Sequence, residues 1–462
     1  MDFDLIIRRG QIISPTGSFE ADIGVTSGKI AAIGELGKAD SERVYDADGK
    51  LVFPGFIDEH VHSRDPGHTH KEDFAHSTRA AAAGGVTTIV EMPNSIPPVT
   101  DEASFRSRVD GLLKQAFVDF GLWGMVLGDA NSKDLPLLAQ AGVVGFKLFW
   151  GYALDRQTLA LAYNPKPGQD VLPPPDDGQI FEAFAAIGKT GRPVAIHAEN
   201  AEIINRFTDR ERRTGGGYAS LLRSRPPFTE ALTVEAGIRI AEAAGVHLHI
   251  LHVSSAEAIE CVSTARKQGR HVTAETCPHY LVLSDEDFDR LGSRLKIFPP
   301  VREARHQAAL WSAIQNGDIQ VIGSDHAPHT PEEKSQDLWS APAGASTVQA
   351  TVPLMLDAVN EGKLSPNQLC ALLAENPAKL LGLYPRKGAI TPGADADIVI
   401  VDMERAMTIR TEDMLSKSRV NPYDGMAVTG APIASFLRGE QLMEGGKLLT
   451  PDSPSGTLVK PV

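Results

Sequence analysis

Two histidines separated by one residue, His60 and His62, stand at the end of an apolar run and could bind one metal ion together. Side chains two residues apart on a β-strand point to the same side, so both imidazoles can face the same ion. Two ordinary hydrogen-bonded histidines at a strand end would give the same pattern. The pair therefore needs partners elsewhere in the chain before it indicates a metal site.

Four further residues with metal-binding side chains also lie at the ends of apolar runs. A lysine lies within VGFKLF, one histidine ends VAIH, another ends HILH, and an aspartate ends VIGSD. If these runs are parallel strands of a barrel, their carboxyl ends meet at one rim, and the six side chains gather there. Histidine and carboxylate ligands with open positions are typical of a catalytic zinc site. The predicted metal ligands are His60, His62, Lys147, His197, His252 and Asp325.

The runs that carry these residues belong to a regular alternation of strand-like and helix-like segments. Eight apolar runs bounded by turn residues lie between residues 51 and 328. Helical segments such as HSTRAAAAGG and GQIFEAFAAIGKT separate most of them. This alternation is the signature of βα units and a parallel sheet. It predicts an α/β fold, a metal-dependent (β/α)8 TIM barrel with its chemistry at the carboxyl ends of the strands.

The two ends of the chain differ from the middle. Residues 1–54 and 386–462 hold short β-rich segments with glycine turns, and neither end has enough strands for a core of its own. We predict one small composite β-sandwich domain formed from both termini, around a barrel at residues 55–385. The segment 152–178 is long, rich in proline and poor in helix signals, which predicts a lid-like loop over the catalytic face.

Composition excludes several classes of protein. The 462 residues include 45 Lys and Arg against 59 Asp and Glu, and the net charge of −14 argues against nucleic-acid binding and against docking on an anionic membrane. The three cysteines form no C-x-x-C pair, which excludes a disulfide scaffold and a cysteine-rich zinc site. The N-terminal MDFDLIIRRG lacks the features of a signal peptide, and no apolar window is long enough for a transmembrane helix. We expect a cytoplasmic protein.

Taken together, the motifs resemble the amidohydrolase superfamily, and within it the cyclic-amide hydrolases: dihydroorotases, allantoinases, hydantoinases and dihydropyrimidinases. The resemblance covers essentially the whole chain and rests on PGFIDEHVHSRDPG (54–67), GGVTTIVEMPN (84–94), VGFKLF (144–149), HAEN (197–200), LHVSS (251–255), TCPHYL (276–281), PPVR (299–302), SDHAPH (324–329) and GADADIVIVD (393–402). It implies a hydrolase of non-peptide C–N bonds that opens the ring of a small cyclic amide, in the manner of a hydantoinase or allantoinase. We also expect a homo-oligomer, either a dimer or a tetramer.

The same resemblance implies a binuclear site, most often of zinc, bridged by a Lys147 that CO2 has carboxylated on its amine. A lysine inside an apolar strand is desolvated, which favours the neutral, nucleophilic amine that this reaction needs. By the resemblance, Asp325 accepts a proton from the attacking hydroxide and returns it to the leaving ring nitrogen. Tyr152 matches the tyrosine with which hydantoinase-type enzymes stabilise the oxyanion. Packing within the lid is the alternative role for this tyrosine.

Some residues expected to contact substrate match dihydroorotases, whereas others match hydantoinases and allantoinases. Arg64 and Asn94 match the dihydroorotase pattern, where they hold a substrate carboxylate, and His329 lies in the SDHAPHT segment that also resembles dihydroorotases. However, Phe298 stands before PPVR, where dihydroorotases usually have an asparagine. Tyr152 and the long segment after Lys147 favour hydantoinases and allantoinases. Dihydroorotase therefore stays open as the alternative within the family.

Three aromatic residues are expected to form an apolar wall in the substrate site. Phe298, Trp150 and Tyr163 could form an apolar wall beside a five- or six-membered cyclic ureide or imide.

An inactive relative acting as a scaffold is the rival function from another class, but such relatives usually lose metal ligands and this chain keeps all six. An exocyclic deaminase or a phosphotriesterase-like hydrolase is disfavoured, because deaminases of this superfamily normally lack the bridging lysine.

Overall fold

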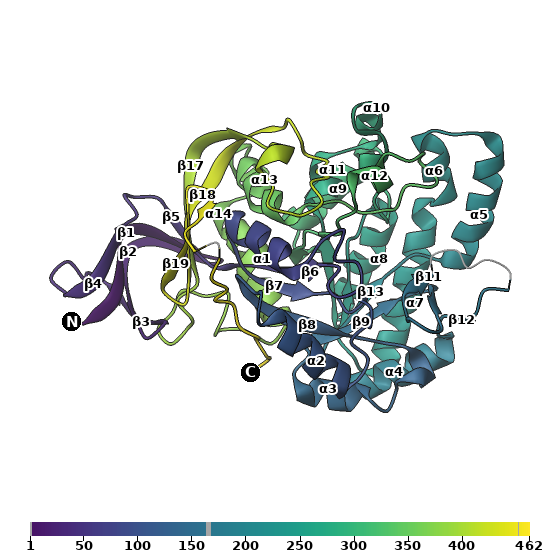
Figure 1. The fold of residues 1–462 in the computed structure, drawn as a ribbon, viewed down its shortest axis with the longest axis horizontal. Coiled ribbons are helices and arrows are strands. Elements are labelled where there is room, and N and C mark those ends of the chain that lie inside the picture. The colour runs from purple at the N-terminus through teal and green to yellow at the C-terminus, as the bar shows by residue number, and fades with distance from the viewer. Residues whose placement is uncertain (1, 163–167, 451) are drawn as a thin grey trace.

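Eight parallel strands follow one another around a nearly closed barrel, as predicted (Figure 1). The computed structural model describes residues 2–162, 168–450 and 452–462. A parallel bridge between Val61 and His326 joins the last strand region to the first. The barrel strands are β6 (Phe56–Val61), β7 (Val86–Glu91), β8 (Asp119–Met125), β9 (Gly145–Phe149), β13 (Val194–His197), β14 (Leu248–Ile250), β15 (Val272–Thr276) and β16 (Val321–Ile322).

Helices surround the barrel and connect its strands. The two segments predicted as helical, HSTRAAAAGG and GQIFEAFAAIGKT, form most of helices α1 and α4. The α-helices are α1 (Phe74–Ala83), α2 (Glu102–Leu112), α3 (Leu135–Ala141), α4 (Asp177–Gly188), α5 (Ala201–Thr214), α6 (Tyr218–Ser224), α7 (Pro227–Ala244), α8 (Ala256–Lys267), α9 (Pro278–Val282), α10 (Phe288–Leu291), α11 (Ala304–Gln315), α12 (Pro331–Lys334), α13 (Val348–Asn360), α14 (Pro366–Cys370) and α15 (Asn376–Leu380).

Helix caps fix the chain directly after two predicted metal ligands. Asn200 caps α5 three residues after His197, and its side chain accepts a hydrogen bond from the backbone of Ile203. Ser255 caps α8 three residues after His252 in the same manner. A cap satisfies backbone N–H groups that the first helical turn leaves without a partner. Each ligand is thus held between the end of a strand and the start of a capped helix.

The two termini share one nine-stranded sheet, which Figure 1 shows at the left of the barrel. The expected composite domain is therefore present as a single hydrogen-bonded sheet, whose strands from both ends enclose a common apolar core. Its strands are β1 (Phe3–Ser14), β2 (Gly17–Thr26), β3 (Lys29–Gly34), β4 (Ser41–Asp46), β5 (Leu51–Pro54), β17 (Ile398–Thr408), β18 (Ala427–Leu437), β19 (Glu440–Glu444) and β20 (Lys447–Leu448).

The first apolar run, residues 51–60, serves both parts of the molecule. β5 pairs with β1 and β17 in the terminal sheet, whereas β6 pairs with β7 in the barrel. Gly55 lies between them, and a Cβ there would stand 2.1 Å from Thr87 Oγ1, so the crossing requires glycine. The division of the chain at residues 54 and 386 stays a prediction.

A buried cluster of ion pairs joins the chain segment after the barrel to the base of the barrel. The Lys387 ammonium lies 2.5 Å from Asp119 of β8, 2.5 Å from Asp397 and 3.0 Å from Asp395. The last residues of the chain return to the same place, because Gly456 donates to Ala116 and Val459 donates to Phe120. The C-terminal tail thus packs against the barrel rather than ending in the terminal sheet.

The predicted lid contains regular structure of its own. Its described residues form a small antiparallel sheet with the order β11-β10-β12, made of β10 (Ala153–Asp155), β11 (Leu161–Ala162) and β12 (Val171–Leu172). Strands of two or three residues are too short to give a periodic pattern in the sequence, so the segment reads as a loop. The sheet stands at the carboxyl end of β9, over the face where the predicted ligands lie.

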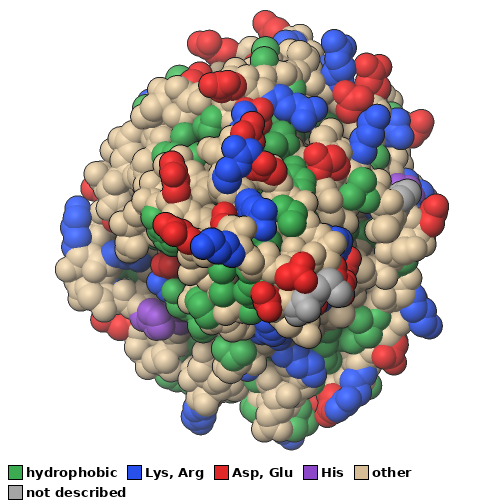
Figure 2. Space-filling model, turned by 90° about the vertical axis from the view of Figure 1, so that its left-hand side faces the viewer, with side chains coloured by type: hydrophobic (Ala, Val, Ile, Leu, Met, Phe, Trp, Pro, Cys, Tyr) green, Lys and Arg blue, Asp and Glu red, His purple; other side chains and the backbone are tan. Residues whose placement is uncertain are grey.

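The surface on the side of the terminal sheet carries both signs of charge. Figure 2 shows acidic and basic side chains interspersed over this face, without a large basic patch that would suit nucleic acid. Within the part of the chain that the structure describes, no helix combines the length and the apolar character needed to cross a membrane.

Candidate metal centre

The six predicted metal ligands line one cavity at the carboxyl ends of the barrel strands. They come from β6, β9 and β13 and from the turns after β6, β14 and β16. Each is at most 8% exposed, so water competes little with interactions among them. The six residues are His60, His62, Lys147, His197, His252 and Asp325.

Two of the imidazoles face the carboxylate of Asp325. Its Oδ1 lies 3.2 Å from His60 Nε2 and 3.5 Å from His62 Nε2. Burial lowers the pKa of both imidazoles to about 4, so both rings are neutral at pH 7, the form that binds metal. Their nitrogens and the carboxylate oxygen lie within 4.8 Å of one another, a spacing that fits one divalent cation.

Acceptors on the far side of these two rings fix their tautomers. His60 Nδ1 lies 3.0 Å from Glu275, and His62 Nδ1 lies 2.8 Å from Asn94 Oδ1. Each Nδ1 therefore carries the proton and donates it, which leaves the lone pair of Nε2 facing Asp325. Such outer partners orient metal-binding histidines and strengthen them as ligands.

The other two histidines form a second group across the cavity. His197 Nδ1 and His252 Nε2 lie 2.9 Å apart. Glu199 stands 3.1 Å from His197 Nε2 and holds the proton there, so that Nδ1 offers a lone pair. Burial lowers the pKa of both imidazoles below its usual value and keeps them neutral. Two nitrogens that converge in this way fit a second cation.

Lys147 is fully buried among these two groups. Among the described residues, its Nζ has no hydrogen-bond partner. Burial lowers its pKa to about 7, although the charges of Glu275 and Asp325 favour the ammonium. A lysine of this kind is largely available as the neutral amine that reacts with CO2. A carboxylated Lys147 would present two oxygens to the two groups of ligands, so the donor set fits a pair of divalent metal ions.

The similarity to known proteins extends over the whole chain. The model of the amidohydrolase family matches residues 51–442. The chain belongs to the amidohydrolase family. An allantoinase of Deinococcus radiodurans is 36% identical over 100% of this chain and 99% of its own length. An L-hydantoinase of Paenarthrobacter aurescens is 35% identical over 97% of this chain and 96% of its own length.

Solved structures of the amidohydrolase family agree with this fold. The L-hydantoinase (dihydropyrimidinase) from Arthrobacter aurescens superposes with a TM-score of 0.93 at 34% identity, covering 99% of this chain and 100% of that chain. A D-hydantoinase structure gives a TM-score of 0.89 at 32% identity, covering 99% of both chains. The family depends on metal ions, which agrees with the clustered ligands described above.

Glu275 is a residue of this amidohydrolase that the sequence reasoning missed. It lies in β15, and its carboxylate accepts from His60 Nδ1 at 3.0 and 3.2 Å and from the backbone N–H of His252 at 2.9 Å. One carboxylate thus positions a ligand from each group. The signal was available, because an acid within an apolar strand is as unusual as the lysine of VGFKLF.

Replacing Glu275 by glutamine is expected to weaken metal binding about 10–100-fold, because His60 loses the carboxylate that holds its proton on Nδ1. The dissociation constant, measured by competition with a chelator, checks this result. Glu235→Gln is the matched control, since the side chain of Glu235 is 62% exposed on α7 and does not line the metal cavity. Equal metal affinity in both variants would show that Glu275 does not position the ligand.

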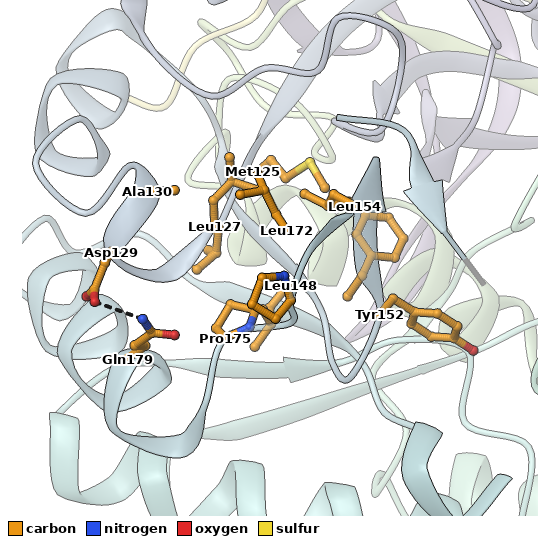
Figure 3. Close-up of a pocket in the computed structure, with 13 residues that line it drawn as sticks. Met125, Leu127, Asp129, Ala130, Leu148, Tyr152, Leu154, Leu172, Pro175 and Gln179 are labelled. Atoms are coloured by element: carbon orange, nitrogen blue, oxygen red, sulfur yellow. Dashed lines mark hydrogen bonds between the residues drawn. The ribbon is translucent and has the colours of Figure 1, made fainter. Parts of the chain in front are cut away.

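Tyr152 lies beside the second group of ligands, at the edge of the lid. Its ring packs edge-on against His197 at 5.2 Å, and its hydroxyl lies 3.5 Å from Arg225. Tyr152 also lines a neighbouring apolar cavity of about 130 Å³ beneath the lid sheet. Figure 3 shows its phenolic oxygen turned away from Met125 and Leu127 of that cavity. The tyrosine therefore separates the lid cavity from the metal site.

The residues predicted to contact substrate lie in the metal site or beside it. Arg64, Asn94 and Phe298 line the cavity of the metal ligands. Arg64 donates to the backbone carbonyl of Pro328, and its Nη2 lies 3.4 Å from Nε2 of His329, which lines an adjoining cavity. Asn94 uses its amide oxygen to accept from His62, so it acts on a ligand as well as on the cavity.

The expected apolar wall is only partly present. The guanidinium of Arg225 stacks on the Phe298 ring at 3.4 Å, so this wall carries a charge. Trp150 is not among the described residues that line the metal cavity, and its ring lies near Gly237 of α7, so its substrate contact stays a prediction. Phe149 lines the metal cavity, and successive residues of a strand point to opposite faces. Tyr163 lies outside the described residues.

Three residues of the site have a left-handed backbone. Arg64, His252 and Asp325 have φ values of 61°, 40° and 45°. This conformation is costly for residues other than glycine and concentrates at functional sites, where the surroundings hold it in place. This backbone conformation directs the three side chains into the cavity just after their strands end.

Proposed function

We propose that this chain is a metal-dependent hydrolase that opens the ring C–N bond of a cyclic ureide or imide, in the manner of a hydantoinase or allantoinase. The observation that carries the proposal is the convergence of His, Lys and Asp side chains on one buried cavity. Relatives named allantoinase and L-hydantoinase match the chain over nearly all of its length, which supports this substrate class over dihydroorotate.

The proposed metals are two divalent ions, most simply zinc, bridged by a carboxylated Lys147. Bound there, the ions would lower the pKa of a water molecule and polarise the ring carbonyl. The amine of Lys147 supports this assignment, because it is buried and has no hydrogen-bond partner in the described part of the chain. One ion would have the ligands His60, His62, Lys147 and Asp325, and the other would have Lys147, His197 and His252.

Asp325 is the proposed proton carrier of the reaction. Its carboxylate faces both His60 and His62 at the floor of the cavity, where the attacking water would be held. It would take a proton from that water and deliver it to the ring nitrogen as the C–N bond breaks. Tyr152 would donate a hydrogen bond from its hydroxyl to the oxygen that becomes negative during the attack.

The proposed substrate contacts are Arg64, Asn94 and Phe298, which line the metal cavity, and His329, which lines the cavity beside it. A guanidinium and an amide can hold the polar edge of a ureide ring by hydrogen bonds. Phe298 supplies a flat apolar surface for the ring itself. The remaining proposals are a cytoplasmic location and a homo-oligomeric state, for which the similarity to other enzymes gives only general support.

A substrate panel tests the proposed function. The metal-loaded enzyme is assayed with dihydroorotate, allantoin, dihydrouracil, hydantoin and aryl-substituted hydantoins. We expect allantoin or a hydantoin to be opened with a kcat/KM at least about tenfold above that of dihydroorotate, because Phe298 replaces a polar contact to the dihydroorotate ring. Turnover of none of these rings would contradict the proposal, and preference for dihydroorotate would favour the alternative function.

A further inference from the structure

A second cavity of about 290 Å³ adjoins the metal site. Arg64, Asn94, Phe298 and Ala343 line both cavities, so a molecule at the metal site can extend into the second. We call this second cavity the basic annex, because of the side chains that line it. Its basic residues are Arg64, Lys71, Arg212, Arg225 and Lys296, and no acidic residue is among its described lining residues.

The charges around the annex do not cancel. Lys71 pairs with Glu333 at 2.7 Å, and Arg225 pairs with Glu199 at 2.5 Å. The Lys296 ammonium donates to backbone carbonyls, among them that of Leu338 at 2.7 Å, and these carry no net charge. Five basic side chains line the annex, whereas the acids nearest them, Glu333, Glu199 and Asp337, are not among its described lining residues, in a protein whose net charge is −14. A cavity of this kind concentrates anions.

Two groups beside the annex respond to its positive potential. Burial, together with the charges of Arg225 and Arg212, lowers the pKa of Lys296 to about 8, against the opposing charge of Asp337. Burial likewise holds the pKa of His329 far below its usual range, with Arg64 and Lys71 adding to the effect. An anion bound between these residues would offset their mutual repulsion.

The annex also has apolar walls. Ile96, Leu161 and Leu221 line it, together with the indole of Trp339, over which the Arg212 guanidinium lies at 5.6 Å. Apolar walls with basic groups among them suit a short aliphatic chain that ends in an acid. Arg212 is an exposed residue of α5, so the acid would be met near the mouth of the annex.

We propose that the basic annex binds an acidic group at the end of a substrate's side arm, so that the enzyme prefers cyclic ureides with a carboxylate-bearing arm over uncharged ones. This inference rests on the proposed ring hydrolysis. The ring would lie at the metal ligands beside Phe298, and the arm would pass this side chain toward Arg212 and Lys71. An acid attached to the ring itself would not need these two outer residues.

The test compares two substrates of nearly equal shape, hydantoin-5-propionate and hydantoin-5-propionamide. We expect kcat/KM to be about tenfold higher for the acid at low salt, with the advantage shrinking as salt screens the contact. Arg212→Gln should lower the acid-to-amide ratio about fivefold. Arg213→Gln is the matched control, because Arg213 is exposed on the same helix, does not line the annex and carries the same charge; it should leave the ratio unchanged.

Several outcomes would overturn the inference while leaving ring hydrolysis intact. One is an amide hydrolysed as fast as the acid, and another is turnover of hydantoin but of neither substituted compound. Equal effects of Arg212→Gln and Arg213→Gln would show that the preference for the acid comes from the net charge of α5 and not from the annex. That result would also overturn the inference. Hydrolysis of no cyclic ureide at all would instead contradict the proposed function.

Discussion

Replacing Lys147 by methionine is expected to lower kcat/KM at least about 10³-fold and to reduce the bound metal from two ions per chain to one or none. Methionine fills a similar volume without placing an unpaired charge in the barrel. The fold should survive, since Lys147 Nζ has no hydrogen-bond partner among the described residues that the change would orphan. The variant loses the side chain that, in the proposed function, bridges the two groups of histidines.

Metal analysis of the purified variant and its steady-state kinetics check this result. Lys267→Met is the matched control, because Lys267 is exposed at the end of α8 and should leave both readings unchanged. Partial recovery by added propionate of a Lys147→Ala variant, whose short side chain leaves room for it, would show that a bridging carboxylate is what is missing. Full metal content and full activity in Lys147→Met would show that Lys147 does not bridge two metal ions.

Asp325→Asn is expected to lower kcat about 10²–10⁴-fold, the usual contribution of a positioned proton carrier. The amide keeps the shape and one oxygen for the metal but cannot accept a proton. KM should change far less than kcat, because the predicted substrate contacts lie elsewhere, at Arg64 and Asn94. Circular dichroism and metal analysis separate this loss from loss of the fold or of the ions.

The pH profile distinguishes proton transfer from a purely structural role for Asp325. If this carboxylate carries the proton, the acidic limb of kcat against pH should disappear in the Asn variant. A general distortion of the site would lower kcat at every pH and keep the limb. A kcat within threefold of the unmodified enzyme would contradict the assignment to Asp325.

The barrel and its ligand-bearing strand ends could be predicted because both follow from local patterns. Buried parallel strands are nearly continuous apolar runs, and the polar residue that ends each run stands out against them. That contrast placed His197, His252 and Asp325 at one rim, and the structure brings them there. The same contrast exists at Glu275, in the middle of a strand rather than at its end.

The positions of side chains in the loops could not be predicted in this way. Trp150 comes one residue after the cavity-lining Phe149, and only the exact end of the strand decides which of them turns outward. The basic annex also escaped prediction, because Lys71, Arg212 and Lys296 come from three distant segments. Their proximity depends on tertiary packing, which no periodic pattern in the sequence records. The lid sheet was missed because its strands are two or three residues long.

Anomalous X-ray diffraction from crystals of the zinc-loaded protein would locate the metal ions and show the state of Lys147. We expect two anomalous peaks about 3.5–4 Å apart, one beside His60 and His62 and the other beside His197 and His252, with extra density joining Lys147 Nζ to both. A single peak, or two peaks with an unmodified Lys147 pointing away from them, would contradict the proposed binuclear site.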